Sequence, residues 1–374
     1  MATKDEDAIT ELFVTSTHNP VLFFSSAGKV YRMKVWRLPE GGPTAKGRPM
    51  LNLLPLAEGE TISTVLPLPE DEATWGGLHI MFATANGTVR RNSMDAFTNV
   101  PTAGKIAMRF GLSDGDAEGE EAGDPTDRLI AVELLTEDDD VLLATRQGKA
   151  IRFKSTDVRE FQSRTSTGVR GIRLLGDDRV ISMSILTRVG TTQEEREAYL
   201  RFAPWKPERE GECPISPDRI AEMESREQFI LTVTENGYGK RTSAYEYRRT
   251  NRGGQGITNI DTSERNGCVV ASFPVSPGEQ LMLVTDQAKV IRTTVADIRI
   301  AGRNTMGVTI FRVGDNEQVV SVARIDESDE EVELEGGGEV APDDGAVVGE
   351  TELDKPADPD LDQRGSEPNE NGGE

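Results

Sequence analysis

Five segments of the chain repeat one pattern of hydrophobic and polar positions. Each has an apolar run, a turn, a second run that carries basic residues, a loop with a glycine, and a closing apolar run. Short runs rich in β-branched and aromatic residues, bounded by turn signals, predict β-strands. The opening runs start at Val21, Leu78, Val141, Phe229 and Leu281, and the closing runs at Ile62, Leu129, Val180, Val269 and Val319.

Turn residues separate the first two predicted strands of every unit. Asn86-Gly87 and Asn236-Gly237 carry the strongest hairpin signal, because both residue types tolerate positive φ. The turn at Gln287-Ala288 departs from that chemistry. A second glycine follows the turn at a nearly constant offset in all units, at Gly47, Gly104, Gly168, Gly256 and Gly307. Four short strands in each of five similar units predict an all-β, propeller-like arrangement of blades around an axis.

Basic residues stand at fixed places in these units. An arginine follows the second turn position by four residues in every unit: Arg32, Arg91, Arg152, Arg241 and Arg292. Because side chains alternate along a strand, we expect one core face and one basic face in each blade. One interpretation is a solvated strand face whose charges protect an edge. The other is a basic track along a rim, which suits duplex DNA held by phosphate contacts and bent without base reading.

Further basic residues beside these arginines and in the glycine loops complete the predicted track. The candidate DNA-binding residues are Lys29, Arg32, Lys34, Lys46, Arg48, Arg90, Arg91, Lys105, Lys149, Arg152, Lys154, Arg170, Lys240, Arg241, Arg252, Lys289, Arg292 and Arg303.

The acidic charge of the chain is confined mainly to two segments. The 374 residues carry 65 acids and 42 bases, a net charge of −23, but 19 of the acids lie in Asp326–Glu374 and seven in 113–127. Both segments are rich in Gly, Pro and acids, which predicts disorder. We therefore expect a folded domain over 1–325, with an acidic loop at 113–127 and a charged insert at 188–227, and a disordered tail over 326–374. The tail either solubilises the protein or competes with a polyanion for the basic face.

The apolar runs, the few cysteines and histidines, and the absence of known catalytic motifs exclude several classes of function. No run approaches 18 apolar residues and the N-terminus has no apolar segment, so we expect neither a membrane span nor a secretory signal, and a cytoplasmic protein. Two cysteines and two histidines make no disulfide framework and no zinc set. No nucleotide-binding P-loop, nucleophile elbow or zinc-protease motif occurs. The sequence predicts a binding module without catalytic centre, metal or cofactor.

Several long motifs resemble the C-terminal domain of the DNA gyrase A protein: H-N-P-V-L-F-F-S-S-A-G-K-V-Y from His18, K-G-R-P-M-L-N-L-L-P-L from Lys46, F-A-T-A-N-G-T-V-R-R from Phe82, T-G-V-R-G-I-R-L from Thr167, N-G-Y-G-K-R-T from Asn236 and G-R-N-T-M-G-V from Gly302. The resemblance implies a β-pinwheel of about six blades, five complete in this chain, that wraps DNA for negative supercoiling. It implies a nucleoid-associated partner of duplex DNA, of the N-terminal part of gyrase A and of gyrase B in an A2B2 complex. ATP and magnesium serve that holoenzyme, and its catalytic tyrosine and ATPase lie elsewhere.

Two departures from the family pattern stand out. The heptad Q-R-R-G-G-K-G is absent, and Arg252–Gly256 resembles only its latter part. Residues 8–16 look like a closing strand without an opening half, so we expect a fragment that starts after the heptad. Two alternatives stay open: the corresponding domain of topoisomerase IV, against which the run from Lys46 argues, and a propeller-like scaffold for protein partners.

Overall fold

The structure of the protein is a computed structural model that describes residues 15–41, 47–110, 126–163, 166–206, 211–287, 289–314 and 316–325. All of them belong to the first of the two units into which the chain divides, Met1–Glu331. The predicted tail, nearly all of the predicted acidic loop and most of the predicted strand over 8–16 lie outside the described residues.

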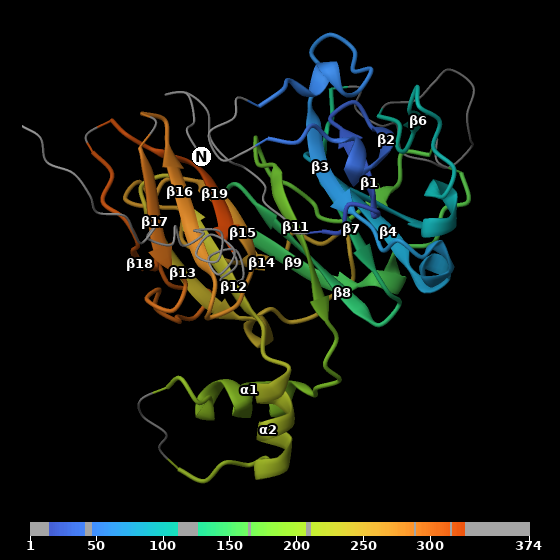
Figure 1. The fold of residues 1–374 in the computed structure, drawn as a ribbon. Coiled ribbons are helices and arrows are strands. Elements are labelled where there is room, and N and C mark those ends of the chain that lie inside the picture. Colours follow the sequence, from blue (N-terminus) through green and yellow to red (C-terminus); the bar gives the residue numbers. More distant parts are fainter. Residues whose placement is uncertain are drawn as a thin grey trace, which may run out of the picture. The chain divides into compact units, whose positions relative to one another are not determined.

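Each repeat folds as a hairpin plus a closing strand in one antiparallel sheet (Figure 1). The predicted all-β pinwheel is confirmed, and every predicted opening and closing strand begins within two residues of its expected position. The hairpin and closing strands are β1 (Pro20–Ser25), β2 (Lys29–Lys34) and β3 (Ile62–Pro67); β4 (His79–Thr84), β5 (Thr88–Ser93) and β7 (Leu129–Leu135); β8 (Asp139–Thr145), β9 (Lys149–Lys154) and β11 (Val180–Thr187); β12 (Phe229–Thr234), β13 (Tyr238–Ser243) and β15 (Val269–Val275); β16 (Gln280–Thr285), β17 (Val290–Thr294) and β19 (Val319–Ile325).

The fourth strand of a blade comes from the next unit, which the sequence pattern did not predict. Short strands after the second glycine pair with the hairpin of the preceding blade, giving orders such as β3-β1-β2-β6. These strands are β6 (Lys105–Ile106), β10 (Val169–Arg170), β14 (Ile257–Thr258) and β18 (Val308–Thr309). In the fifth sheet, β17-β16-β19, the structure describes only three strands. Every complete blade is therefore fastened to its successor by backbone hydrogen bonds.

The hydrophobic core lies between successive blades. Closing strands contact one another in chain order, β3 with β7, β7 with β11, β11 with β15 and β15 with β19, so these edges form the centre of the wheel. The short exchanged strands consequently lie at the outer edges. Phe24 of the first blade packs edge-on against Phe82 of the second, with ring centroids 5.6 Å apart. Each interface buries one face from each of two sheets, as stacked sheets require.

The charged insert between the third and fourth blades contains both α-helices that the structure describes, α1 (Gln193–Phe202) and α2 (Pro217–Ser225). Thr192 caps α1 in a capping box with Glu195, and Ser216 caps α2. Tyr199 stacks edge-on against Tyr245 of the fourth blade at 4.9 Å between centroids, which attaches the insert to the wheel. Neither helix is long and apolar enough to cross a membrane.

A buried carboxyl group where the insert meets the wheel makes stability depend on pH. Burial raises the pKa of Glu227 from 4.5 to about 7, although its carboxyl oxygens lie 2.9 and 3.0 Å from the Ser243 hydroxyl. A folded-state pKa above the unfolded value means that the folded protein binds this proton more tightly. The protonated Glu227 carboxyl therefore makes its full contribution to the free energy of unfolding below about pH 4.5. This contribution, at most about 3 kcal/mol, is lost as the pH rises to about 7.

We expect Glu227→Gln to remove this part of the pH dependence. Urea unfolding of both proteins at several pH values across that window measures it. Identical pH profiles for the two proteins would show that Glu227 is not the source.

Candidate nucleic-acid interface

The segments around Gly104, Gly168, Gly256 and Gly307, which we call the clasp loops, contact the hairpin turn of the preceding blade. The carbonyl oxygen of Gly148 accepts hydrogen bonds from the backbone N–H groups of Asn259 at 2.8 Å and Ile260 at 3.4 Å. Gly256, at the entry to β14, has φ +73, and a Cβ there would lie 2.5 Å from the Ala150 carbonyl oxygen. Glycine at this place is therefore required for the close strand entry.

Neighbouring clasp loops also touch one another. Gly253 N–H donates to the Gly171 carbonyl at 2.6 Å, and Arg173 N–H donates to the Gly254 carbonyl at 2.8 Å. One blade further, Arg303 Nη1 donates to the Thr258 carbonyl at 3.2 Å. The loops thus form a continuous surface along the outer edges of successive blades.

Basic side chains follow this surface, which we call the outer belt. Its members are Lys149, Arg170, Arg173, Arg252 and Arg303. The first three are exposed and the last two half-buried. Arg252 donates to the backbone carbonyls of Asp157 at 2.9 Å and Arg170 at 3.0 Å. A carbonyl fixes a guanidinium group without neutralising it, so the anchored arginines keep their charge available to an anion.

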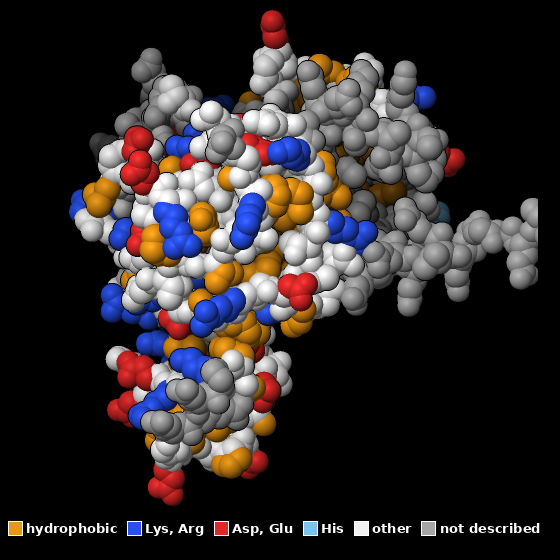
Figure 2. All heavy atoms as spheres, turned by 90° about the vertical axis from the view of Figure 1, so that its left-hand side faces the viewer, with side chains coloured by type: hydrophobic (Ala, Val, Ile, Leu, Met, Phe, Trp, Pro, Cys, Tyr) orange, Lys and Arg blue, Asp and Glu red, His pale blue; other side chains and the backbone are white. Residues whose placement is uncertain are grey.

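Figure 2 shows Lys and Arg side chains spread over the face formed by the blades of β13, β17 and β18, whereas acidic side chains gather on the helical insert below. This distribution continues the basic character of the outer belt towards the fifth blade.

The five arginines in register do not form an exposed ribbon, and that expectation is wrong. Arg91, Arg152 and Arg241 are only 6 to 8% exposed. Arg152 Nη1 donates to the Ala244 carbonyl of the following blade at 2.9 Å, and Arg241 donates to the carbonyls of Ala296 at 2.9 Å and Ile298 at 2.7 Å.

The first and last arginines of the series complete this pattern. Arg32 is half-buried and bonds the Thr98 carbonyl of the following blade and Glu72. Arg292, in the fifth hairpin, is exposed. The next blade packs against this face of a hairpin, and Arg32, Arg152 and Arg241 donate to carbonyl groups that it brings. Arg91 instead lies 3.6 Å from the Glu137 carboxylate.

Two further predicted residues are buried inside the wheel. Lys240 donates to the carbonyls of Gly302, Arg303 and Thr305 at 2.7 to 2.9 Å, and its burial lowers its pKa to about 7. Arg90 makes the corresponding contacts in the second blade, with the carbonyls of Ser163 and Ser166 at 2.9 Å. These cations hold the loops of the outer belt in place and do not reach the surface.

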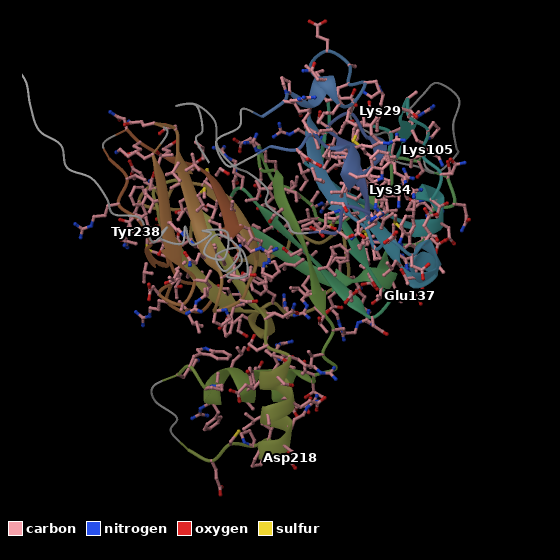
Figure 3. The ribbon with its side chains drawn as sticks, viewed as in Figure 1. Lys29, Lys34, Lys105, Glu137, Asp218 and Tyr238 are labelled. Carbon is pink, nitrogen blue, oxygen red and sulfur yellow. The ribbon has the colours of Figure 1, made fainter. Side chains whose placement is uncertain are left out.

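The other predicted residues lie at or near the surface. Figure 3 shows Lys29, Lys34 and Lys105 in the region of the first blade. Lys34 donates to the His18 carbonyl at 2.8 Å, and Lys105 to that of Asn99 at 2.9 Å. Lys29 and Lys289 are in ion pairs, with Glu60 at 3.6 Å and with Glu317 at 2.6 Å. Arg48 is exposed and Lys154 is half-buried, while Lys46 lies outside the described residues. Their contact with DNA stays a prediction.

Comparison with known proteins gives the family. The profile of the family "DNA gyrase C-terminal domain, beta-propeller" matches residues 19–69, 78–117, 139–187, 228–276 and 279–326. The chain belongs to this gyrase domain family. It is 48% identical over 85% of its length to the DNA gyrase A protein of Granulibacter bethesdensis, and 38% identical over 91% to that of Escherichia coli. It spans about a third of the length of these relatives, covering 35% and 33%.

Solved structures agree with the gyrase domain fold. The DNA gyrase A C-terminal domain superimposes with a TM-score of 0.59 at 21% identity, over 85% of this chain and 89% of that one. The C-terminal domain of DNA topoisomerase IV gives 0.65 at 18% identity, over 90% and 89%. The fold is therefore common to both, and the assignment to gyrase rests on the family profile and the sequence relatives.

Two arrangements in this gyrase domain were not found from the sequence. Asp140 gathers three arginines, Arg152, Arg188 and Arg249, although these residues are far apart along the chain. Arg265 lies over the ring of Tyr238 at 4.4 Å, on the outer part of the fourth blade. Packing of the third blade, the insert and the fourth blade brings Asp140 and its arginines together, and the repeat pattern contained no signal for that.

Proposed function

We propose that this chain binds and bends duplex DNA without reading its sequence, through phosphate contacts along the outer belt. The observation that carries the proposal is the contact between successive clasp loops, which brings Arg173 beside Gly254 and Arg303 beside Thr258. Lys149 Nζ lies 3.4 Å from the Thr258 hydroxyl, so it joins the same surface. Lysine and arginine supply phosphate contacts that are independent of base sequence. A belt that follows the outer edges of a wheel requires the bound duplex to curve.

Within this proposal the chain acts as the C-terminal part of gyrase A. It wraps DNA and so supports ATP-dependent negative supercoiling by a type IIA topoisomerase. The chain itself binds no cofactor. The N-terminal part of gyrase A contributes the strand-cleaving tyrosine, and gyrase B hydrolyses ATP with magnesium in an A2B2 assembly at the nucleoid. The relatives of the chain are gyrase A proteins, which supports this placement.

Charge reversal on the outer belt tests DNA binding. Lys149→Glu with Arg173→Glu changes two exposed side chains, one beside the third hairpin turn and one in a clasp loop, and leaves the buried cations in place. We expect affinity for a labelled duplex to fall more than about tenfold, and the slope of log affinity against log salt to fall by about 2, since each lost phosphate contact removes about 0.9. Fluorescence anisotropy over a salt series measures both quantities.

The matched control reverses two exposed charges on the helical insert, Arg201→Glu with Lys206→Glu, and changes the net charge equally. It should retain nearly the wild-type affinity. Equal losses in both variants would reduce the effect to overall charge and contradict binding by the belt. Unchanged DNA affinity in the belt variant would instead favour a scaffold for protein partners.

A further inference from the structure

A small pocket between the third blade, the fourth blade and the helical insert is rich in arginine. Its volume is about 180 Å³, and its lining includes Asp140, Arg152, Thr191, Arg196 and Arg249. Drug-sized ligands occupy pockets of roughly 300 Å³ or more, so this one suits a single small group. At ~30 Å³ for each water molecule, it holds the equivalent of about six.

The charges around the pocket are unequal. Asp140 is the one carboxylate among the described residues of its lining, and it is 1% exposed. Its oxygens are already engaged by Arg152 Nη2 at 2.9 Å and by Arg188 Nε at 3.3 Å. Arg249 Nη1 is left at 3.9 Å from the same carboxylate. Arg188 also lies 3.8 Å from the exposed Asp138. Three guanidinium groups, those of Arg152, Arg196 and Arg249, therefore line the pocket with one buried carboxylate, which leaves an excess of positive charge.

One arginine of the pocket is uncommitted. The Arg196 side chain makes no hydrogen bond or ion pair with any residue that the structure describes, although it lines the same cavity as Arg249. Arg196 comes from α1, while Arg249 comes from the loop that precedes β14. Holding two cations together across separate elements is unfavourable unless an anion neutralises them. The planar guanidinium fork matches tetrahedral oxyanions, with two parallel hydrogen bonds to each group.

We propose that this pocket binds a phosphoryl oxyanion. Arg196 and Arg249 hold its oxygens, the Thr191 hydroxyl donates a further hydrogen bond, and Arg152 with Asp140 forms the rigid floor. The source of the phosphoryl group is either the backbone of bound DNA or a free phosphorylated compound. The pocket is separate from the outer belt residues Lys149 and Arg173, so it stands or falls independently of the proposed function.

Inorganic phosphate is the first probe. At constant ionic strength set with sodium chloride, phosphate should raise the melting temperature of the wild-type chain. Arg196→Gln with Arg249→Gln should abolish that rise, because the amides lose the charge and the fork. Arg196→Lys with Arg249→Lys keeps the charge and should restore part of it. The control, Arg201→Gln with Arg226→Gln on exposed parts of the insert, should respond as the wild type does. An equal rise in the Arg196/Arg249 glutamine variant, or no rise in the wild type, overturns the proposal.

A second arm with labelled duplex identifies the source. Weaker DNA binding by the Arg196/Arg249 glutamine variant, with a salt slope lower by about 1 to 2, assigns the phosphoryl group to the DNA backbone. Unchanged DNA binding together with a lost phosphate response assigns it to a free compound. The belt variant Lys149→Glu with Arg173→Glu should keep the wild-type phosphate response. The phosphate result can therefore be interpreted even if the outer belt does not bind DNA.

Discussion

Replacing Asp140 by alanine is expected to destabilise the wheel by about 3–5 kcal/mol. The Asp140 carboxylate accepts from Arg152 Nε at 3.0 Å and Nη2 at 2.9 Å, and both side chains are almost completely buried. Burial already lowers the pKa of the Arg152 guanidinium, which the nearby Asp140 opposes. Without the carboxylate, a charged guanidinium remains inside the fold with no counter-charge. Urea unfolding followed by circular dichroism measures the change.

Two further variants distinguish the cost of an unpaired buried charge from the cost of a substitution as such. Asp140→Leu with Arg152→Met removes both charges, and we expect it to recover most of the loss. Arg292→Ala changes the same register position in the fifth hairpin, where the arginine is exposed and bonds the Gln280 side chain. Its cost should stay within about 0.5 kcal/mol. A loss under about 1 kcal/mol for Asp140→Ala would show that the pair behaves as a surface ion pair.

The local part of the fold could be predicted from the sequence. Turns such as Asn86-Gly87 and Asn236-Gly237 fix hairpins through residues that tolerate positive φ, and alternating apolar residues fix the strands beside them. These signals act between neighbours in the chain. The exchanged strands β6, β10, β14 and β18 have two residues each, too few for any periodic pattern. Their pairing depends on the clasp with the preceding blade, which is a tertiary contact.

The fate of each predicted cation depends on a residue that the repeat pattern does not contain. Arg152 meets Asp140, whereas Arg292 meets Gln280, the residue in the same place of the fifth hairpin. Arg241 lies over the ring of Phe229 at 5.9 Å. A following blade buries Arg152 and Arg241, and the structure describes none after the fifth. The sequence therefore predicted which residues are basic and in register, but packing decided which of them face solvent.

Gly148→Ala is expected to cost about 2–5 kcal/mol, because it combines a strained backbone with a steric clash. Gly148 has φ +76, and a Cβ there would meet the Ile260 carbonyl oxygen and lie 2.8 Å from Thr262 Cγ2. The clasp loop must then move, which weakens the hydrogen bond from Asn259 N–H to the Gly148 carbonyl. Faster hydrogen exchange of the Asn259 amide, with a lower urea midpoint, reports this opening.

Gly59→Ala isolates the backbone part of that cost. Gly59 has the same φ of +76, but no atom lies within 4 Å of a Cβ built on it. We expect it to lose only about 1–2 kcal/mol and to leave the exchange of the Asn259 amide unchanged. If the two variants lost equal stability, the clasp would contribute nothing beyond the turn conformation. A larger loss of stability for Gly148→Ala means instead that the clasp loop of the following unit requires glycine in the hairpin turn. Contacts between each hairpin turn and the next clasp loop then stabilise successive blades of this gyrase domain.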